Sequence, residues 1–121
     1  MARKKQPPIS PDDRGVIGTL LRDVRRAAGY RSVEGASSTR GCPASRQTIY
    51  AYERGGLVPA LPQFLELIEF YVLVAPSNGG KPETDLRAQG VAAVMRVLAL
   101  PAYHVSHAME LIARMQPGST A

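Results

Sequence analysis

The chain has 121 residues, of which 45% are hydrophobic, and it carries a formal net charge of +5 at pH 7. This length suits one small domain, and the basic balance favours a polyanionic partner such as nucleic acid. The single cysteine, Cys42, excludes an internal disulfide or a cysteine metal cage. Because no secretory segment and no membrane-spanning apolar run is found, we expect a cytoplasmic protein with no membrane partner.

The first helix is expected to begin at Pro11, after a basic flexible arm over residues 1–10. Ser10 offers a hydroxyl cap, Pro11 suits the first helical position, and Asp12 and Asp13 face the positive end of the helix dipole. A core face at helical spacing then runs to Gly29. It consists of Val16, Ile17, Leu20, Leu21, Val24, Ala27 and Ala28. We expect the other face to be solvated, with Arg22, Asp23, Arg25 and Arg26.

A short second helix is expected over residues 33–40, capped by Ser32. Gly35, Ser37 and Ser38 are poor helix formers, so packing against other helices has to hold it. A turn over residues 41–44 follows. It contains Pro43, which forces the residue before it out of helical geometry.

The segment 45–54 is the most informative part of the chain. Its helical periodicity places Ser45, Ile49, Tyr52 and Glu53 on one side, and Gly55 ends the helix. The opposite side presents Arg46, Gln47, Tyr50, Ala51 and Arg54. Arginine pairs with guanine, glutamine pairs with adenine, and a small alanine lets a helix approach a thymine methyl. The pattern predicts a helix that reads bases in the major groove of DNA.

Pro62 opens a fourth helix that carries two apolar stripes. The core stripe comprises Phe64, Leu65, Ile68, Tyr71 and Val72, and the second comprises Leu67, Phe70 and Val74.

Residues 76–82 are turn-rich and predict a linker. Two further helices are expected over residues 83–116, split at Leu100-Pro101 and followed by a disordered tail at 117–121. Their stripes are Val91, Val94, Met95 and Leu98, then Val105, Ala108, Met109, Ile112 and Met115. We expect these tail helices to cover the second stripe of the fourth helix.

The order of a core helix, a capped short helix, a turn, Ser-x-x-Thr-Ile-x-x-x-Glu-x-Gly and an apolar helix resembles the Xre/Cro-type helix-turn-helix family. The resemblance covers about Arg14 to Leu73. It implies an all-α, lambda-repressor-like bundle over residues 11–75. It also implies that Arg46 and Gln47 are the main base readers, that Thr48 and Ala51 lie at the groove, and that Glu53 ties the helix end to the domain.

Further DNA contacts are expected around this helix. On the presented face, Tyr50 either packs on the DNA or leans onto the neighbouring helix. The expected phosphate contacts are Ser45, Thr48, Arg54, Ser32, Arg31, Arg3, Lys4 and Lys5. For the last three, a solubilising tail is the alternative to an arm that follows the phosphates.

The tail is similar to that of the mycobacterial EspR-type regulators and their actinobacterial relatives, through Leu86-Arg87-Ala88-Gln89-Gly90-Val91 and the break at Leu100-Pro101. Those proteins dimerise through this region. The resemblance implies dimerisation through the tail. Because the tail carries more apolar residues than one small domain can bury, we expect the interface to comprise Val94, Leu98, Tyr103, Met109, Ile112 and Met115.

These features predict a sequence-specific, DNA-binding transcriptional regulator that is associated with the nucleoid and acts as a homodimer, with repression by promoter occlusion as the simplest mechanism. Two alternatives stay open: an antitoxin or protein-binding adaptor on the same fold, or an EspR-like architectural protein that bridges DNA sites. We expect no enzyme and no cofactor, because no acid-base or nucleophile constellation falls at consistent spacing. We expect His104 and His107, which lie three residues apart, to be a surface pair and not a metal site.

Overall fold

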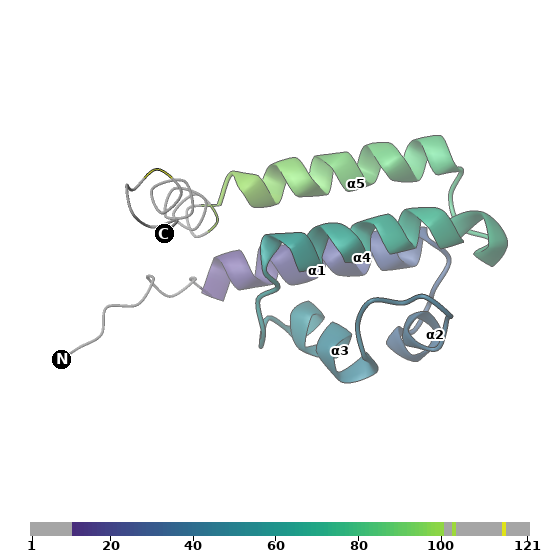
Figure 1. The fold of residues 1–121 in the computed structure, drawn as a ribbon, viewed down its shortest axis with the longest axis horizontal. Coiled ribbons are helices and arrows are strands. Elements are labelled where there is room, and N and C mark those ends of the chain that lie inside the picture. Colours follow the sequence, from purple (N-terminus) through teal and green to yellow (C-terminus); the bar gives the residue numbers. More distant parts are fainter. Residues whose placement is uncertain (1–10, 101–102, 104–114, 116–121) are drawn as a thin grey trace.

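The computed structural model describes residues 11–100, 103 and 115, and this part of the chain contains helices and no strand (Figure 1). The elements are α1 (Pro11–Ala27), α2 (Val33–Ser37), α3 (Arg46–Arg54), α4 (Leu61–Val74), the 3-10 helix η1 (Ala75–Asn78) and α5 (Glu83–Leu98). The predicted all-α class is confirmed. Within the same residues, no helix combines the length and the apolar character needed to cross a membrane.

Helices α1 and α4 lie at the centre of the fold. Helix α5 packs along one side of them, and α2 and α3 lie on the other side (Figure 1). Every α-helix contributes to one hydrophobic core, whose members include Ile17, Leu21, Val33, Ile49, Phe64, Tyr71, Leu86 and Val97. Because α5 shares this core with α1 and α4, it belongs to the same packed body as α3.

One prediction about α1 is wrong. Ile17, Leu21 and Val24 are buried as expected, but Arg25, assigned to a solvated face, is only 4% exposed. Its guanidinium is buried because it has a carboxylate partner on α3, which compensates the loss of water.

Helix α2 is shorter than the predicted 33–40, and it ends at Ser37. The hydroxyls of Ser37 and Ser38 both donate to the backbone oxygen of Glu34, and Thr39 donates to that of Gly35. Short polar side chains that bond to nearby carbonyls compete with helix propagation. The connection to α3 therefore spans residues 38–45 and is longer than the predicted four-residue turn.

Helix α4 places its apolar residues differently from the prediction. Leu65, assigned to the core stripe, is 42% exposed, whereas Leu67 and Phe70 of the second stripe are buried. Phe70 is covered by the ring of Tyr30, with ring centroids 6.5 Å apart and an interplanar angle of 6°. The loop after α1 thus covers Phe70, one member of the stripe that was expected to meet the tail helices.

The segment predicted as a linker, residues 76–82, is packed against the end of α1. The Asn78 side-chain amide donates to the Ala28 oxygen at 3.0 Å, and the Lys81 amide donates to the Ala27 oxygen at 2.8 Å. A Cβ atom on Gly80 would lie 2.5 Å from the Ala28 carbonyl carbon, so only glycine allows this approach. These contacts orient the start of α5 relative to α1.

Helix α5 ends at Leu98, just before the predicted break at Leu100-Pro101. Its buried residues are Leu86, Gly90, Ala93 and Val97. The apolar stripe identified in the sequence lies beside them, and Val91 and Met95 are 58% and 63% exposed. The second tail helix, with Met109 and Ile112, falls outside the described residues.

Candidate nucleic-acid interface

Helix α3 ends at Arg54, before Gly55, as predicted, but it begins at Arg46 and not at Ser45, which caps it instead. The Ser45 hydroxyl accepts a hydrogen bond from the Thr48 amide at 3.1 Å and also donates to the Thr48 hydroxyl. At the other end, Gly55 takes a φ of 81°, a left-handed conformation that glycine adopts without strain. The helix is therefore terminated on both sides by its own sequence.

The inner side of α3 is anchored in the protein. Ile49 is fully buried, and Tyr52 and Glu53 are 5% and 8% exposed, as their spacing predicted. Ser45, assigned to the same side, is exposed instead because it caps the helix from outside its first turn.

Arg25 and Glu53 form a buried, bidentate ion pair between α1 and α3. Arg25 Nε lies 2.8 Å from Glu53 Oε2, and Nη2 lies 2.9 Å from Oε1. A third donor, Nη1, reaches the Tyr30 oxygen at 3.1 Å. The hydrogen bonds to Glu53 raise the pKa of Arg25 against the opposing effect of burial. The sequence indicated that Glu53 anchors the helix, but it did not identify Arg25 as the partner.

Further contacts fix the C-terminal end of α3 on α1. Arg22 donates to the Glu53 backbone oxygen and Arg14 to the Gly55 oxygen, both at 3.3 Å. Guanidinium groups at the negative end of a helix dipole are stabilising. The two backbones also approach closely at Gly18, where a Cβ atom would lie 2.5 Å from the Glu53 oxygen and 2.8 Å from that of Tyr52.

The outer face of α3 presents polar side chains to solvent. Arg46, Gln47, Tyr50 and Arg54 are exposed, and Ala51 is half-buried between them. We call these five residues the outer face of α3. Of the residues expected to contact phosphates, Ser45, Arg31 and Ser32 are also exposed, and Thr48 is half-buried. Arg3, Lys4 and Lys5 lie outside the described residues.

An acidic residue on α2, Glu34, contacts the outer face of α3. The Tyr50 hydroxyl donates to Glu34 Oε2 at 2.9 Å, and Arg46 Nη1 lies 3.8 Å from the same oxygen. The hydrogen bond to Glu34 raises the pKa of Tyr50. The pKa of Glu34 is lowered, first by a hydrogen bond from the Glu34 backbone and second by the hydrogen bond from Tyr50. Of the two interpretations of Tyr50, the contact with the neighbouring helix is present. Glu34 itself was not predicted.

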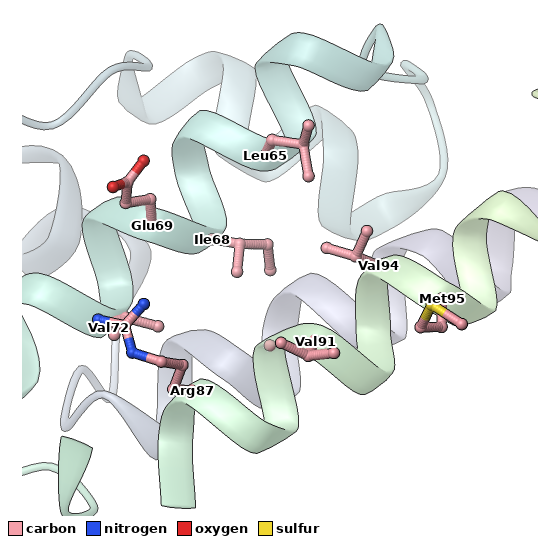
Figure 2. A pocket seen from close by; sticks show the side chains of 9 residues that line it. Leu65, Ile68, Glu69, Val72, Arg87, Val91, Val94 and Met95 are labelled. Atoms are coloured by element: carbon pink, nitrogen blue, oxygen red, sulfur yellow. The ribbon is translucent and has the colours of Figure 1, made fainter. Parts of the chain in front are cut away.

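A second surface feature lies on the other side of the fold. An apolar groove of about 340 Å³ runs along the surface where α4 and α5 meet, and Figure 2 shows side chains of both helices around it. Its lining residues are Leu65, Ile68, Glu69, Val72, Arg87, Gly90, Val91, Val94 and Met95. We call it the α4–α5 groove. Val94, predicted at a dimer interface, lines it and is half-buried.

The other predicted interface residues fall in different environments. Leu98 and Met115 are 37% and 77% exposed. Tyr103 is 8% exposed, and its hydroxyl donates to the Pro59 oxygen within the same chain. Tyr103 therefore belongs to the core of the protomer, and its ring leaves little surface for a partner.

Comparison with protein-family models, with curated proteins and with solved structures finds no match to this chain. The geometry of α3 and its surroundings therefore carries the functional assignment.

Proposed function

We propose that the protein is a sequence-specific DNA-binding regulator that places α3 in the major groove. The observation that carries this proposal is the division of α3 into two sides. Ile49, Tyr52 and Glu53 are buried, while Arg46 and Gln47 are exposed at the first turn, where a docked helix meets base edges. Arginine and glutamine are the side chains that pair with guanine and adenine.

The rigidity of α3 supports base reading over loose attachment. Direct readout needs side chains held in register, and α3 is fixed by a buried ion pair, by two arginines on its terminal carbonyls and by the glycine contact with α1. The net charge of +5 adds attraction to phosphates.

We propose that the active form is a homodimer in which the α4–α5 groove contacts a second copy. A single recognition helix reads only a short half-site, so two copies extend the sequence that is recognised. The exposed apolar side chains at the groove, Leu65, Val91 and Met95, form the kind of patch that marks an interface. Helix α5, which forms one wall of the groove, lies on the opposite side of α1 and α4 from α3 (Figure 1), so a partner on this wall leaves the outer face of α3 free for DNA.

The function is tested by selection from a random pool of duplex DNA at physiological salt, followed by titration of the enriched duplex. We expect enrichment of a defined sequence, and a binding constant whose logarithm falls with log salt by about 0.9 per phosphate contact. Enrichment of no sequence above the starting pool, with no measurable binding, contradicts the proposal. The protein-binding adaptor is then favoured, since the α4–α5 groove would remain as the surface to explain.

A further inference from the structure

We propose that Glu34 is a specificity-determining residue of this surface, which restrains Arg46 and Tyr50 and disfavours their contact with phosphates. The inference rests on the proposed function. Its basis is the position of one carboxylate oxygen, Oε2 of Glu34, against two side chains of the outer face of α3. A carboxylate is unexpected there, because a surface selected only for attraction to DNA gains from positive charge.

The contact with Arg46 is loose, and this matters for its role. Arg46 Nη1 is 3.8 Å from Glu34, whereas Arg25 makes bonds of 2.8 and 2.9 Å to Glu53. The Arg25 Nε and Nη2 donors are already bonded to Glu53, in a pair that holds α3 on α1. The Arg46 guanidinium stays half-exposed and keeps its planar fork of donors available, as bidentate pairing with guanine requires.

The contact with Tyr50 is a hydrogen bond, and it affects both the hydroxyl proton and the ring of Tyr50. Because the Tyr50 hydroxyl donates its proton to Glu34, that proton is not available to a phosphate oxygen. The bond joins the Tyr50 side chain, on α3, to α2, and the residue remains 37% exposed. Its ring offers an apolar face to a sugar or a thymine methyl.

The negative charge of Glu34 has different effects on the two DNA contacts that Arg46 can make, one with a phosphate and one with a guanine edge. A phosphate bound by Arg46 would come within the Debye length of the Glu34 carboxylate, about 8 Å at physiological salt, so the two anions would repel each other. A guanine edge carries no formal charge, so the carboxylate repels its O6 and N7 acceptors much less than it repels a phosphate. Glu34 therefore weakens binding to arbitrary duplexes more than binding to the preferred site, and it widens the ratio between the two affinities.

The test compares wild type with Glu34→Gln on the selected duplex and on a scrambled duplex of equal length and composition. The glutamine keeps an acceptor for Tyr50 and removes only the charge. We expect affinity for the scrambled duplex to rise, its salt dependence to steepen and the ratio of the two affinities to fall at least about threefold. Because Glu34 is exposed, the melting temperature should not change.

Glu83→Gln is the matched control. Glu83 also lies in an exposed carboxylate–arginine pair, 3.0 Å from Arg87, but on α5. The Glu83→Gln substitution removes one negative charge, as Glu34→Gln does, and it should leave the ratio of the affinities for the selected and scrambled duplexes unchanged. In an Arg46→Ala background, Glu34→Gln should no longer lower the ratio, because the carboxylate acts through Arg46.

An unchanged ratio in Glu34→Gln, or an equal gain on both duplexes, overturns the inference while leaving the proposed function intact. A wild-type protein that binds neither duplex instead removes the proposed function, and this inference with it.

Discussion

Glu53, in the last turn of α3, is joined to Arg25 of α1 by two short hydrogen bonds between side chains that are 6% and 5% exposed. The pair links the inner side of the proposed recognition helix to the central helix of the fold. Its position explains how a short helix can hold the polar outer face in one orientation.

Removal of one member of this pair should destabilise the fold strongly. Glu53→Gln leaves the Arg25 charge buried without its carboxylate, and we expect a loss of about 3 kcal/mol in the free energy of unfolding. Chemical denaturation measures it. In the exposed Glu83–Arg87 pair, Glu83→Gln should cost less than about 0.5 kcal/mol. Equal losses of unfolding free energy in Glu53→Gln and Glu83→Gln would contradict a buried ion pair between Arg25 and Glu53.

Two glycines of α1 should respond in opposite directions to substitution by alanine. A Cβ atom at Gly18 would meet the backbone oxygens of α3 at 2.5 and 2.8 Å, so Gly18→Ala has to push α3 outward. At Gly15 nothing lies within 4 Å, and Gly15→Ala should stabilise the helix by about 0.5 to 1 kcal/mol. Thermal unfolding distinguishes them, and a neutral Gly18→Ala would contradict the close α1–α3 contact.

The hydroxyls of two buried tyrosines should contribute with opposite sign. Within the described residues, the Tyr71 hydroxyl has no hydrogen-bond partner, while that of Tyr103 donates to Pro59. Tyr71→Phe removes an unsatisfied polar group and should be neutral or stabilising, whereas Tyr103→Phe should cost about 1 kcal/mol. Urea titrations of both variants measure the difference. The reverse order would contradict the bonding described for both hydroxyls.

Stability should fall at alkaline pH. Burial raises the pKa of Tyr103 to about 12, above its ordinary value, and raises that of Tyr71 as well. The unfolded chain loses these protons from about pH 10 while the folded chain retains them, so stability is retained below about pH 10 and declines toward pH 12. Denaturation at several alkaline pH values measures the decline, which Tyr103→Phe should reduce. An identical decline in that variant would exclude Tyr103 as a source.

A charge in the α4–α5 groove should separate the proposed dimer without unfolding the protomer. Val91→Asp places a carboxylate on an exposed position of the groove, so we expect monomers by sedimentation and weaker binding to paired half-sites. Leu73→Asp is the control, because Leu73 is 64% exposed and does not line the groove. A wild type that is already monomeric at micromolar concentration would contradict this interface.

The sequence predicted the parts of the fold that depend on local rules. The end of α3 and its inner side follow from Gly55 and one buried stripe, and both act within a few residues. The start was predicted one residue early, because Ser45 caps the helix and does not belong to it. The same rules located the start of α4 near Pro62 and the end of α5 before Leu100-Pro101.

What the sequence missed depends on contacts between distant segments. Arg25 follows the spacing of the charged face of α1, and only the position of Glu53 makes its burial favourable. On α5, the helix contact runs through Gly90, whose Cβ position would lie 2.9 Å from Ile68. Small residues allow helices to approach, so a search for large apolar side chains selected the neighbouring stripe at Val91 and Met95. Glu34 was missed because its partners lie on a different helix.

The central claim is that the outer face of α3 reads DNA bases, and Arg46→Ala on the selected duplex tests it most directly. We expect binding to that duplex to weaken by about 1 to 3 kcal/mol and the base preference to be lost at one guanine position. Binding to a scrambled duplex should change little. Arg96→Ala, which removes an exposed arginine from α5, should affect both duplexes equally. If Arg46→Ala weakens binding to every duplex by the same factor as Arg96→Ala, then Arg46 does not read bases and the claim is wrong.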